Sequence, residues 1–260
     1  MRGFSYLLGT ALSMASAVSS TAIILPLYVW PIDDSTWSPV YDAISSHPDI
    51  EFQVIINPDS GPGDTTYPDA NLITGISTLN IYDNVHVIGY IRTNYAECAQ
   101  AEVDSQIAVY SGWSSYTAKN ISVSGIFFDE APRTNDNTKI SYMQSISATA
   151  KSSNLNTIVF NPGTPLEEES AAEYFEAADL IVEFEKPYSE WTSIIPADQF
   201  SSSKTYGKDA MIVYSAPLTA DYEAVVQEAQ GMGLGAVYLT SSDDYMSLDT
   251  VPKVAASFTQ

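Results

Sequence analysis

The sequence predicts an α/β protein, a single-domain (β/α)8 TIM barrel over residues 23–260 that follows a signal peptide. Three observations predict it. The chain has 260 residues, and such a barrel typically needs about 250. Eight short apolar segments alternate with longer polar or amphipathic segments, which is typical of parallel strands joined by crossover helices. No linker or change in composition divides the chain after residue 22.

The first segment, residues 1–17, is typical of a secretory signal peptide. Arg2 gives a positively charged start, an apolar run follows, and Ala15-Ser16-Ala17 has the small-x-small form of a cleavage site. A second site of this form leaves cleavage as late as residue 22 open. A hydrophobic N-terminal strand or a single membrane anchor is the alternative, but the run is short for a membrane span. We therefore predict a secreted, extracellular protein, in which the sequon at Asn120 is open to N-glycosylation.

The predicted strands are nearly continuous apolar runs, as expected of strands that are covered on both faces. They span residues 22–30, 52–57, 85–91, 123–129, 157–161, 180–185, 210–215 and 235–240. Helical character is found between them at 38–46, 69–81, 97–116, 138–152, 166–177 and 220–232. Eight strand-helix repeats favour the closed barrel over an open doubly wound sheet.

Polar and aromatic residues stand at or after the carboxyl ends of these strands. In a barrel all eight ends open onto one face, where the active sites of this fold lie. Aromatic rings suit the apolar faces of pyranose sugars, although packing in the core or in a loop is an equal alternative for any one of them. The residues that we expect to bind substrate are Tyr28, Trp30, Trp37, Asn57, Tyr90, Asn161, Tyr188 and Tyr214.

Composition excludes several classes of protein. The 32 Asp and Glu residues against 10 Lys and Arg residues give a formal charge of -22, which opposes binding to nucleic acid and to anionic membranes. One cysteine, Cys98, permits no intramolecular disulfide and no cysteine-based zinc cluster. The chain lacks the Gly-x-Ser-x-Gly, His-Glu-x-x-His and Gly-Lys-Ser/Thr motifs. We expect a monomer that uses carboxylate chemistry with no metal and no cofactor.

Two adjacent acids, Asp129 and Glu130, end the fourth strand. Acids are costly at the end of an apolar strand, because each must be solvated, hydrogen-bonded or protonated there. Adjacent strand residues point to opposite faces, so both acids can face the mouth only if the strand ends between them. The alternative is that they cap the following loop, with Arg133 as partner. Their place at the mouth of a barrel favours a catalytic role.

Another acid, Glu185, ends the sixth strand. Glu183 shares its face by the two-residue period of a strand and is either a second acid of the site or turned toward a helix and paired with Lys186. Carboxylates on the fourth and sixth strands face each other across a barrel mouth. Paired carboxylates of this kind are the groups that glycoside hydrolysis uses. The catalytic candidates are thus Asp129, Glu130 and Glu185.

Six segments of the chain together resemble the spherulin-4 (spherulation-specific) family, glycoside hydrolase family 135, over about residues 23–240. They are Ile-Leu-Pro-Leu-Tyr-Val-Trp-Pro at 24–31, Ile-Ile-Asn-Pro-Asp-Ser-Gly-Pro-Gly at 55–63, Val-Ile-Gly-Tyr-Ile-Arg-Thr at 87–93, Tyr-Ser-Gly-Trp at 110–113, Gly-Ile-Phe-Phe-Asp-Glu at 125–130 and Phe-Glu at 184–185. The resemblance implies a (β/α)8 barrel. It also implies an endo-acting enzyme, because fungal members cleave α-1,4-linked N-acetylgalactosamine in galactosaminogalactan, a secreted exopolysaccharide of galactose, N-acetylgalactosamine and galactosamine.

Carried over residue by residue, the family's acidic trio matches Asp129, Glu130 and Glu185, and Asn57 with the loop 60–63 matches a feature near its cleft. The chain departs from the family where Ala96 replaces a glycine that we expect after Tyr95. Partly deacetylated galactosaminogalactan is cationic, so the acidity of the chain would attract it, although solubility is the simpler reason for that acidity.

For an enzyme with this acidic trio we expect Asp129 as nucleophile, Glu185 as general acid and base, and Glu130 as the group that orients or tunes the pair, and the sequence leaves Glu130 open as the alternative nucleophile. Attack by the acetamide oxygen of the substrate is the other route, and the spacing of the acids tells retention, which we expect, from inversion. The alternatives are a non-catalytic carbohydrate-binding wall protein and a hydrolase of another hexosaminide or galactoside.

Overall fold

The computed structural model describes residues 21–192, 199–201 and 206–258. The predicted signal peptide, residues 1–17, lies outside the described residues and stays a prediction.

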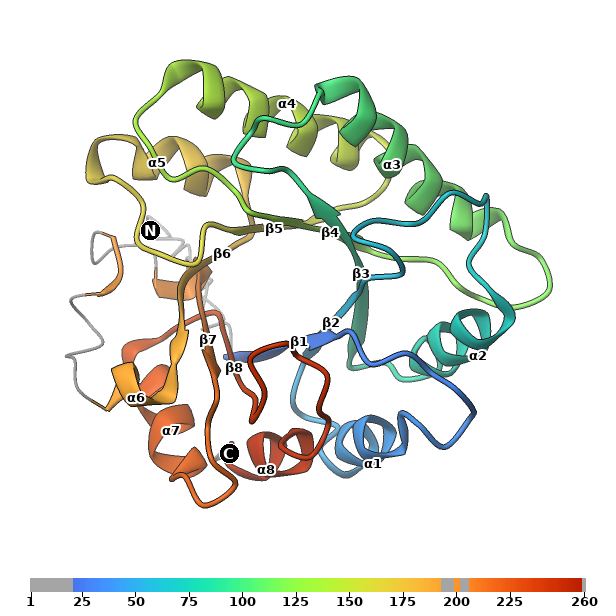
Figure 1. Cartoon of the computed structure of the whole chain (residues 1–260), viewed down its shortest axis with the longest axis vertical. Coiled ribbons are helices and arrows are strands. Elements are labelled where there is room, and N and C mark those ends of the chain that lie inside the picture. The colour runs from blue at the N-terminus through green and yellow to red at the C-terminus, as the bar shows by residue number, and fades with distance from the viewer. Residues whose placement is uncertain (1–20, 193–198, 202–205, 259–260) are drawn as a thin grey trace, which may run out of the picture.

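Eight parallel strands in the described part of the chain form a closed barrel in the order β1 to β8, with helices around it (Figure 1). The barrel closes where Ala22 and Ile23 pair with Ala236 and Val237. The strands are β1 (Ala22–Leu27), β2 (Phe52–Ile56), β3 (Val85–Arg92), β4 (Gly125–Asp129), β5 (Thr157–Asn161), β6 (Leu180–Pro187), β7 (Asp209–Tyr214) and β8 (Ala236–Leu239). The predicted (β/α)8 barrel is therefore confirmed.

The helices lie outside the barrel (Figure 1). They are α1 (Ser38–Ser46), α2 (Ala70–Leu79), α3 (Gln100–Gly112), α4 (Asn137–Ser152), α5 (Glu168–Ala177), α6 (Tyr188–Trp191), α7 (Tyr222–Met232) and α8 (Val251–Ala256), with 3-10 turns at Trp113–Ser115 and Tyr206–Lys208. The six predicted helices are present. Helices α6 and α8 are not predicted, because four and six residues are too few for an amphipathic period. None of the described helices has the length and apolar composition to cross a bilayer.

Aspartates begin three of the helices. Asp69 accepts hydrogen bonds from the backbone of Asn71 and Leu72 at 2.8 and 2.9 Å and so caps α2. Asp136 caps α4 and Asp221 caps α7 in the same way. Each cap satisfies backbone N–H groups that have no partner within the helix, so part of the acidity of this chain defines where its helices begin.

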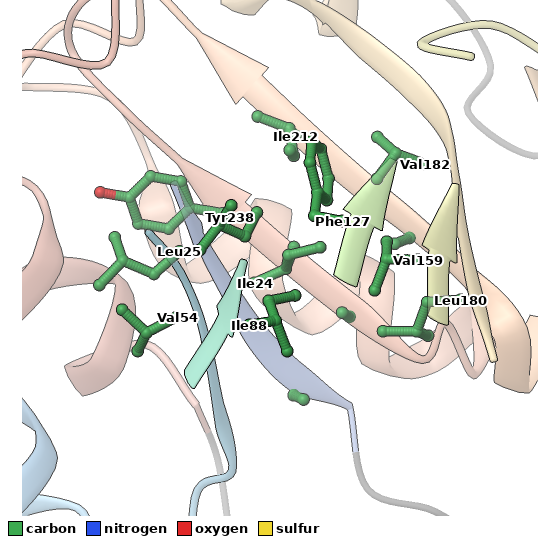
Figure 2. Packing of buried hydrophobic residues seen from close by; sticks show 14 of the residues in the cluster. Ile24, Leu25, Val54, Ile88, Phe127, Val159, Leu180, Val182, Ile212 and Tyr238 are labelled. Carbon is green, nitrogen blue, oxygen red and sulfur yellow. The ribbon is translucent and has the colours of Figure 1, made fainter. Parts of the chain in front are cut away.

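The core fills the barrel and the space between barrel and helices. Its buried side chains form one continuous cluster, and those labelled in Figure 2 come from all eight strands. Ile24, Ile88, Val159 and Val182 are inaccessible to solvent. Burial of each such side chain contributes about 1.5–3 kcal/mol. Hydrophobic packing therefore holds the strand ends in place without a disulfide among the described residues.

A bulge interrupts β6 at Glu183. Val182 pairs with Ala210 and Phe184 with Met211, so Glu183 is the extra residue. Its carboxylate is fully buried and accepts hydrogen bonds from the backbone of Leu166 and from the backbone and hydroxyl of Ser201.

This bulge corrects the expectation that Glu183 and Glu185 share a face. Phe184 packs on Phe200 beside the partners of Glu183, whereas Glu185 hydrogen bonds to other residues at the barrel mouth. The expectation is wrong because an extra residue breaks the two-residue period of the strand. The alternative pairing of Glu183 with Lys186 is also wrong, since the ammonium group of Lys186 lies 3.4 Å from Glu190.

Candidate active site

Asn161 joins two of the predicted catalytic acids. It stands at the end of β5 in register with Asp129 at the end of β4. Its amide nitrogen, Nδ2, donates to Asp129 Oδ1 and to Glu185 Oε2, both at 2.8 Å. The side chain of Asn161 is only 6% exposed, so packing fixes this bridge. The structure therefore brings Asp129 and Glu185 together through one amide group.

The bridge limits the distance between the two carboxylates. Because both oxygens lie 2.8 Å from the same nitrogen, they can be no further apart than twice that distance. Retaining glycosidases hold their carboxyl groups about 5–5.5 Å apart, and inverting enzymes about 6.5–9.5 Å apart. The two bridged oxygens are thus closer together than the carboxyl groups of inverting enzymes.

Two tyrosines donate to the remaining carboxylate oxygens. Tyr90 donates to Asp129 Oδ2 at 2.6 Å, and Tyr245 donates to Glu185 Oε1. Between them the ring of Tyr28 packs edge-on against both, with centroids 5.8 Å from Tyr90 and 5.7 Å from Tyr245. Both oxygens of each acid thus have a hydrogen-bond donor. The two phenol donors are held in place by packing on the ring of Tyr28.

Tyr245 is the site residue that sequence analysis misses. It lies in the loop after β8, in the segment Ser-Ser-Asp-Asp-Tyr-Met at 241–246, beyond the strand end at which a site residue is expected. Its backbone adopts a left-handed conformation with φ 61°, which is uncommon outside glycine. That unusual conformation of the loop puts the phenol within reach of Glu185, and no sequence pattern indicates it.

Burial raises the pKa of both acids. For Asp129, hydrogen bonds from Tyr90, the Glu130 backbone and Asn161 oppose this rise. For Glu185, Tyr245 and Asn161 oppose it, and the charge of Asp129 adds to it. Burial first and the nearby carboxylates second also hold the pKa values of the Tyr90 and Tyr245 phenols far above their usual range, so both stay protonated donors. A carboxyl group with a raised pKa can hold the proton that a general acid must deliver.

Glu130 turns away from this pair. Strand β4 ends at Asp129, as the sequence requires if both acids are to face the mouth, but Glu130 follows with φ 49° and its carboxylate is directed to Arg92. Its carboxylate lies 2.9 Å from the guanidinium of Arg92, so the alternative partner Arg133 is wrong for it. Thr93 donates to the carbonyls of both acids at 3.0 and 2.9 Å and fixes the turn. Glu130 acts on Asp129 through its charge, which raises the pKa of that carboxyl.

Four of the predicted substrate-binding residues lie at or next to the two acids. Tyr90 and Asn161 contact the acids directly, and Tyr28 contacts Tyr90. Tyr214 ends β7, where burial and then the charge of Glu185 raise the pKa of its phenol.

Three others lie in the loops at the mouth. Trp30 follows β1 and is 40% exposed. Asn57 follows β2, and its buried Oδ1 accepts no hydrogen bond from the described residues. Tyr188 is half-buried at the start of α6 and packs on the core. Of these three, Trp30 offers the most open ring for a ligand.

Trp37 is a correction. Its ring is 1% exposed, its indole nitrogen donates to the carbonyl of Val29 at 2.7 Å, and it packs on Gly75 of α2 so closely that a Cβ there would lie 2.4 Å from the ring. The expectation that Trp37 binds substrate is wrong, because the ring is buried in the packing between α1 and α2.

Ala96 has a backbone φ of 65°, in the left-handed region that favours glycine. It follows Asn94 and Tyr95, which have φ values of 49° and 57°. This conformation explains why a glycine is expected at position 96. The alanine leaves strain in the loop that supports Glu130, whose carbonyl accepts from the Tyr95 backbone at 2.6 Å.

Among the residues that the structure describes, no group of three or more histidine, cysteine, aspartate or glutamate side chains is arranged to hold a metal ion. The described site holds two half-buried carboxyl groups with amide and phenol donors around them.

Comparisons with known proteins agree with this architecture. The family model of spherulation-specific family 4, Spherulin4, matches residues 22–259. Spherulin-4 of Physarum polycephalum is 27% identical over 235 residues, which are 87% of this chain and 65% of that protein. The chain thus spans less than two thirds of the length of this relative.

Solved structures give the same result. The crystal structure of Aspergillus clavatus Sph3 in complex with GalNAc superposes with a TM-score of 0.79 and 29% identity, covering 92% of this chain and 97% of that chain. A chitinase from Bacteroides thetaiotaomicron has a TM-score of 0.55 at 8% identity, covering 92% of this chain and 96% of that chain, and shares the fold alone. The chain belongs to spherulation-specific family 4, the spherulin-4 family, and folds as a closed (β/α)8 barrel.

Proposed function

We propose that this protein is a secreted, endo-acting glycoside hydrolase that cleaves α-1,4-linked N-acetylgalactosamine in a galactosaminogalactan-type exopolysaccharide. The observation that carries the proposal is the pair of half-buried acids, Asp129 and Glu185, held by one amide at the barrel mouth. The family relative Sph3 binds GalNAc and matches 92% of this chain, which supports the choice of sugar.

Asp129 is the nucleophile in this proposal. It accepts hydrogen bonds from Tyr90 and Asn161, which favour the ionised carboxylate that must attack the anomeric carbon and oppose the rise in its pKa that burial causes. Glu185 is the general acid. Burial raises its pKa, so it can protonate the glycosidic oxygen as the bond to the leaving sugar breaks. Glu185 then removes a proton from the water that releases the sugar from Asp129.

Asn161 has a positioning role in both steps. Its two amide hydrogens hold the acids at a fixed separation, while its Oδ1 has no partner among the described residues. Asn161→Asp would place a third carboxylate between the two acids and is expected to abolish hydrolysis.

The acetamide of the substrate is not the nucleophile in this proposal. In an α-linked N-acetylgalactosamine the acetamide at C2 and the leaving group at C1 lie on the same face of the ring, so its carbonyl oxygen cannot attack the anomeric carbon from the opposite side. A 5-fluoro N-acetylgalactosaminyl fluoride tests direct attack by the carboxylate. Covalent labelling of Asp129, seen by peptide mass spectrometry, supports it, whereas labelling of another residue contradicts the role of Asp129.

The proposed function is tested by incubating the protein with purified galactosaminogalactan and analysing released oligosaccharides by mass spectrometry. Asp129→Asn and Glu185→Gln should each lower the rate by about 100- to 10,000-fold. Glu173→Gln is the matched control, because Glu173 is exposed on α5 and its loss changes the net charge equally. Binding of the polymer by all four proteins without any product would instead support a non-catalytic carbohydrate-binding barrel.

Secretion and glycosylation belong to the same proposal. Asn120 is exposed, and its Oδ1 accepts from the hydroxyl of Ser122 at 2.7 Å within the sequon. This geometry supports an N-glycan at Asn120 if the chain enters the secretory pathway. The mass and N-terminal sequence of the protein recovered from culture medium test both points, with cleavage between residues 17 and 22 expected.

A further inference from the structure

A cavity of about 390 Å³ lies among the loops that follow β4 and its neighbours, at the end of the barrel where the paired acids stand. It spans the loops that follow β3, β4 and β5, and it includes Ala131, two residues after Asp129, and Pro162, next to Asn161. A volume of this size is in the range of ligand pockets. The cavity is therefore placed to hold another part of a polymer whose scissile bond lies between the acids.

The lining of this cavity is neutral or cationic. Arg133 and Lys139 line it, and no Asp or Glu does, in a chain that has 32 acids and 10 bases. Tyr95, whose side chain is 53% exposed, gives an aromatic face beside Pro162. An aromatic face with few polar groups is the surface on which a sugar ring stacks.

Arg133 is the cation of this cavity that stays uncompensated. The ammonium group of Lys139 lies 3.2 Å from Glu97, so that charge is paired. The guanidinium of Arg133 donates to the carbonyl of Pro165 at 3.3 Å, and no described carboxylate lies within ion-pairing distance of it. Arg133 is exposed, so its charge acts on whatever occupies the cavity.

We infer that this cavity is an outer sugar subsite that accepts a neutral, N-acetylated ring and rejects a deacetylated ring, with Arg133 as the residue that determines this specificity. The inference rests on the proposed function, since it takes the occupant to be a sugar of the same polymer. A ring with a free amine carries an ammonium group, and the Arg133 guanidinium repels it. An acetamide is neutral, and its carbonyl oxygen accepts a hydrogen bond from the same guanidinium.

The size of the effect follows from Coulomb's law. Two like charges about 6–8 Å apart change an equilibrium by about two- to threefold in water and by about thirtyfold or more at the dielectric constant usual near a protein surface. Because Arg133 is exposed and salt screens its charge, we expect an effect of about three- to tenfold. The carboxylates near the cavity weaken the repulsion only in part, because Glu97 is paired with Lys139 and Glu130 with Arg92. Arg133 therefore repels an ammonium group within this cavity, although the chain as a whole is strongly negative.

The test compares fully N-acetylated α-1,4-linked galactosamine oligosaccharides with partly deacetylated oligosaccharides of the same length. Mass spectrometric sequencing of the products shows which rings beside the cut carry a free amine. In wild type one ring position near the cut is depleted of free amines by about three- to tenfold. Arg133→Gln loses this depletion, and Arg133→Lys keeps it because the charge remains.

Lys151→Gln is the matched control. Lys151 lies in the last turn of α4 and its ammonium group is 3.9 Å from Asp179, so it changes net charge by the same amount outside the cavity. It should leave the depletion unchanged. Equal depletion in wild type and Arg133→Gln, or equal loss in Lys151→Gln and Arg133→Gln, overturns the inference.

Calorimetric titration of the same oligosaccharides separates this inference from the proposed function. If wild type cuts neither set but binds the acetylated set more tightly, and Arg133→Gln removes that preference, hydrolysis fails and the subsite stands. If wild type cuts the acetylated oligosaccharides and the preference is the same in both proteins, hydrolysis stands and the subsite fails.

Discussion

Single hydrogen bonds affect whether Asp129 and Glu185 are protonated or ionised. Tyr245 is the clearest case, because its phenol donates to Glu185 from a loop far along the chain. A hydrogen bond to a carboxylate favours the ionised form and so lowers its pKa. At Glu185 this contribution opposes the rise that burial causes.

Tyr245→Phe should therefore raise the pKa of Glu185. Because Glu185 must be protonated to act as the general acid, the alkaline limb of the kcat/KM profile should move to higher pH. Tyr41→Phe is the control, since Tyr41 lies on α1 and donates to the backbone of Gly75 on α2. An alkaline limb that stays in place in Tyr245→Phe, or that moves to lower pH, contradicts the role of Tyr245.

The raised pKa of Glu185 also couples stability to pH. A carboxyl group whose pKa is higher in the folded state binds more protons folded than unfolded, so its contribution to stability falls as pH rises through that range. Glu185→Gln removes this loss of stability at higher pH. The difference in Tm between the variant and wild type should therefore shift in favour of the variant as pH rises from about 4 to 7. A difference that does not change with pH, measured by calorimetry, would show that the pKa of Glu185 is not raised.

At the scale of elements, the bulge in β6 ties neighbouring loops to the site. Glu183 accepts from Leu166 after β5 and from Ser201 beyond α6. Gly163, with φ 66°, donates its N–H to the carbonyl of Val182 and accepts from the N–H of Glu185 at 3.1 Å. The bulge therefore orients Glu185 toward Asn161, while Glu183 hydrogen bonds to the loops that contain Leu166 and Ser201.

Glu183→Ala should lower the free energy of unfolding by about 3 kcal/mol, because it leaves buried N–H donors without acceptors. The measurement is urea denaturation followed by tryptophan fluorescence. Glu173→Ala, on the exposed face of α5, should change stability by less than about 0.5 kcal/mol. Equal stabilities of the two variants would mean that the Glu183 contacts contribute nothing.

The loop after β3 carries strain that one substitution should relieve. Ala96→Gly removes the cost of a Cβ in the left-handed region and should raise the free energy of unfolding by about 1 kcal/mol. Ala108→Gly is the matched control on the exposed face of α3, where the same change should lower stability by about 1 kcal/mol. A loss in both variants would show that position 96 is not strained.

At the scale of the whole molecule, periodic patterns predicted the barrel well. Strands such as 52–57 and 157–161 are short apolar runs between helices, and their real counterparts begin at the same residues. The pairing of Ala22 with Ala236 closes the barrel, and no local pattern indicates that contact because the residues are far apart in sequence.

The site was predicted less completely than the fold. Asp129 and Glu185 were expected because acids that end apolar strands are unusual. The bridge through Asn161 depends on the register of β4 and β5, and the contact of Tyr245 depends on a loop conformation, so neither has a sequence signal. The expectation for Trp37 is wrong for a different reason: its sequence position near the mouth is correct, but an aromatic residue there can point into the core as readily as into the cleft.

In the proposed mechanism Asp129 and Glu185 act as a retaining pair. Proton NMR in D2O on an N-acetylated α-1,4-linked galactosamine oligosaccharide distinguishes retention from inversion, because it follows the anomeric proton of the first product formed. We expect the α-anomer to be released first and then to mutarotate, in wild type and not in Glu185→Gln. Release of the β-anomer first, or hydrolysis that persists in Glu185→Gln, would contradict this mechanism.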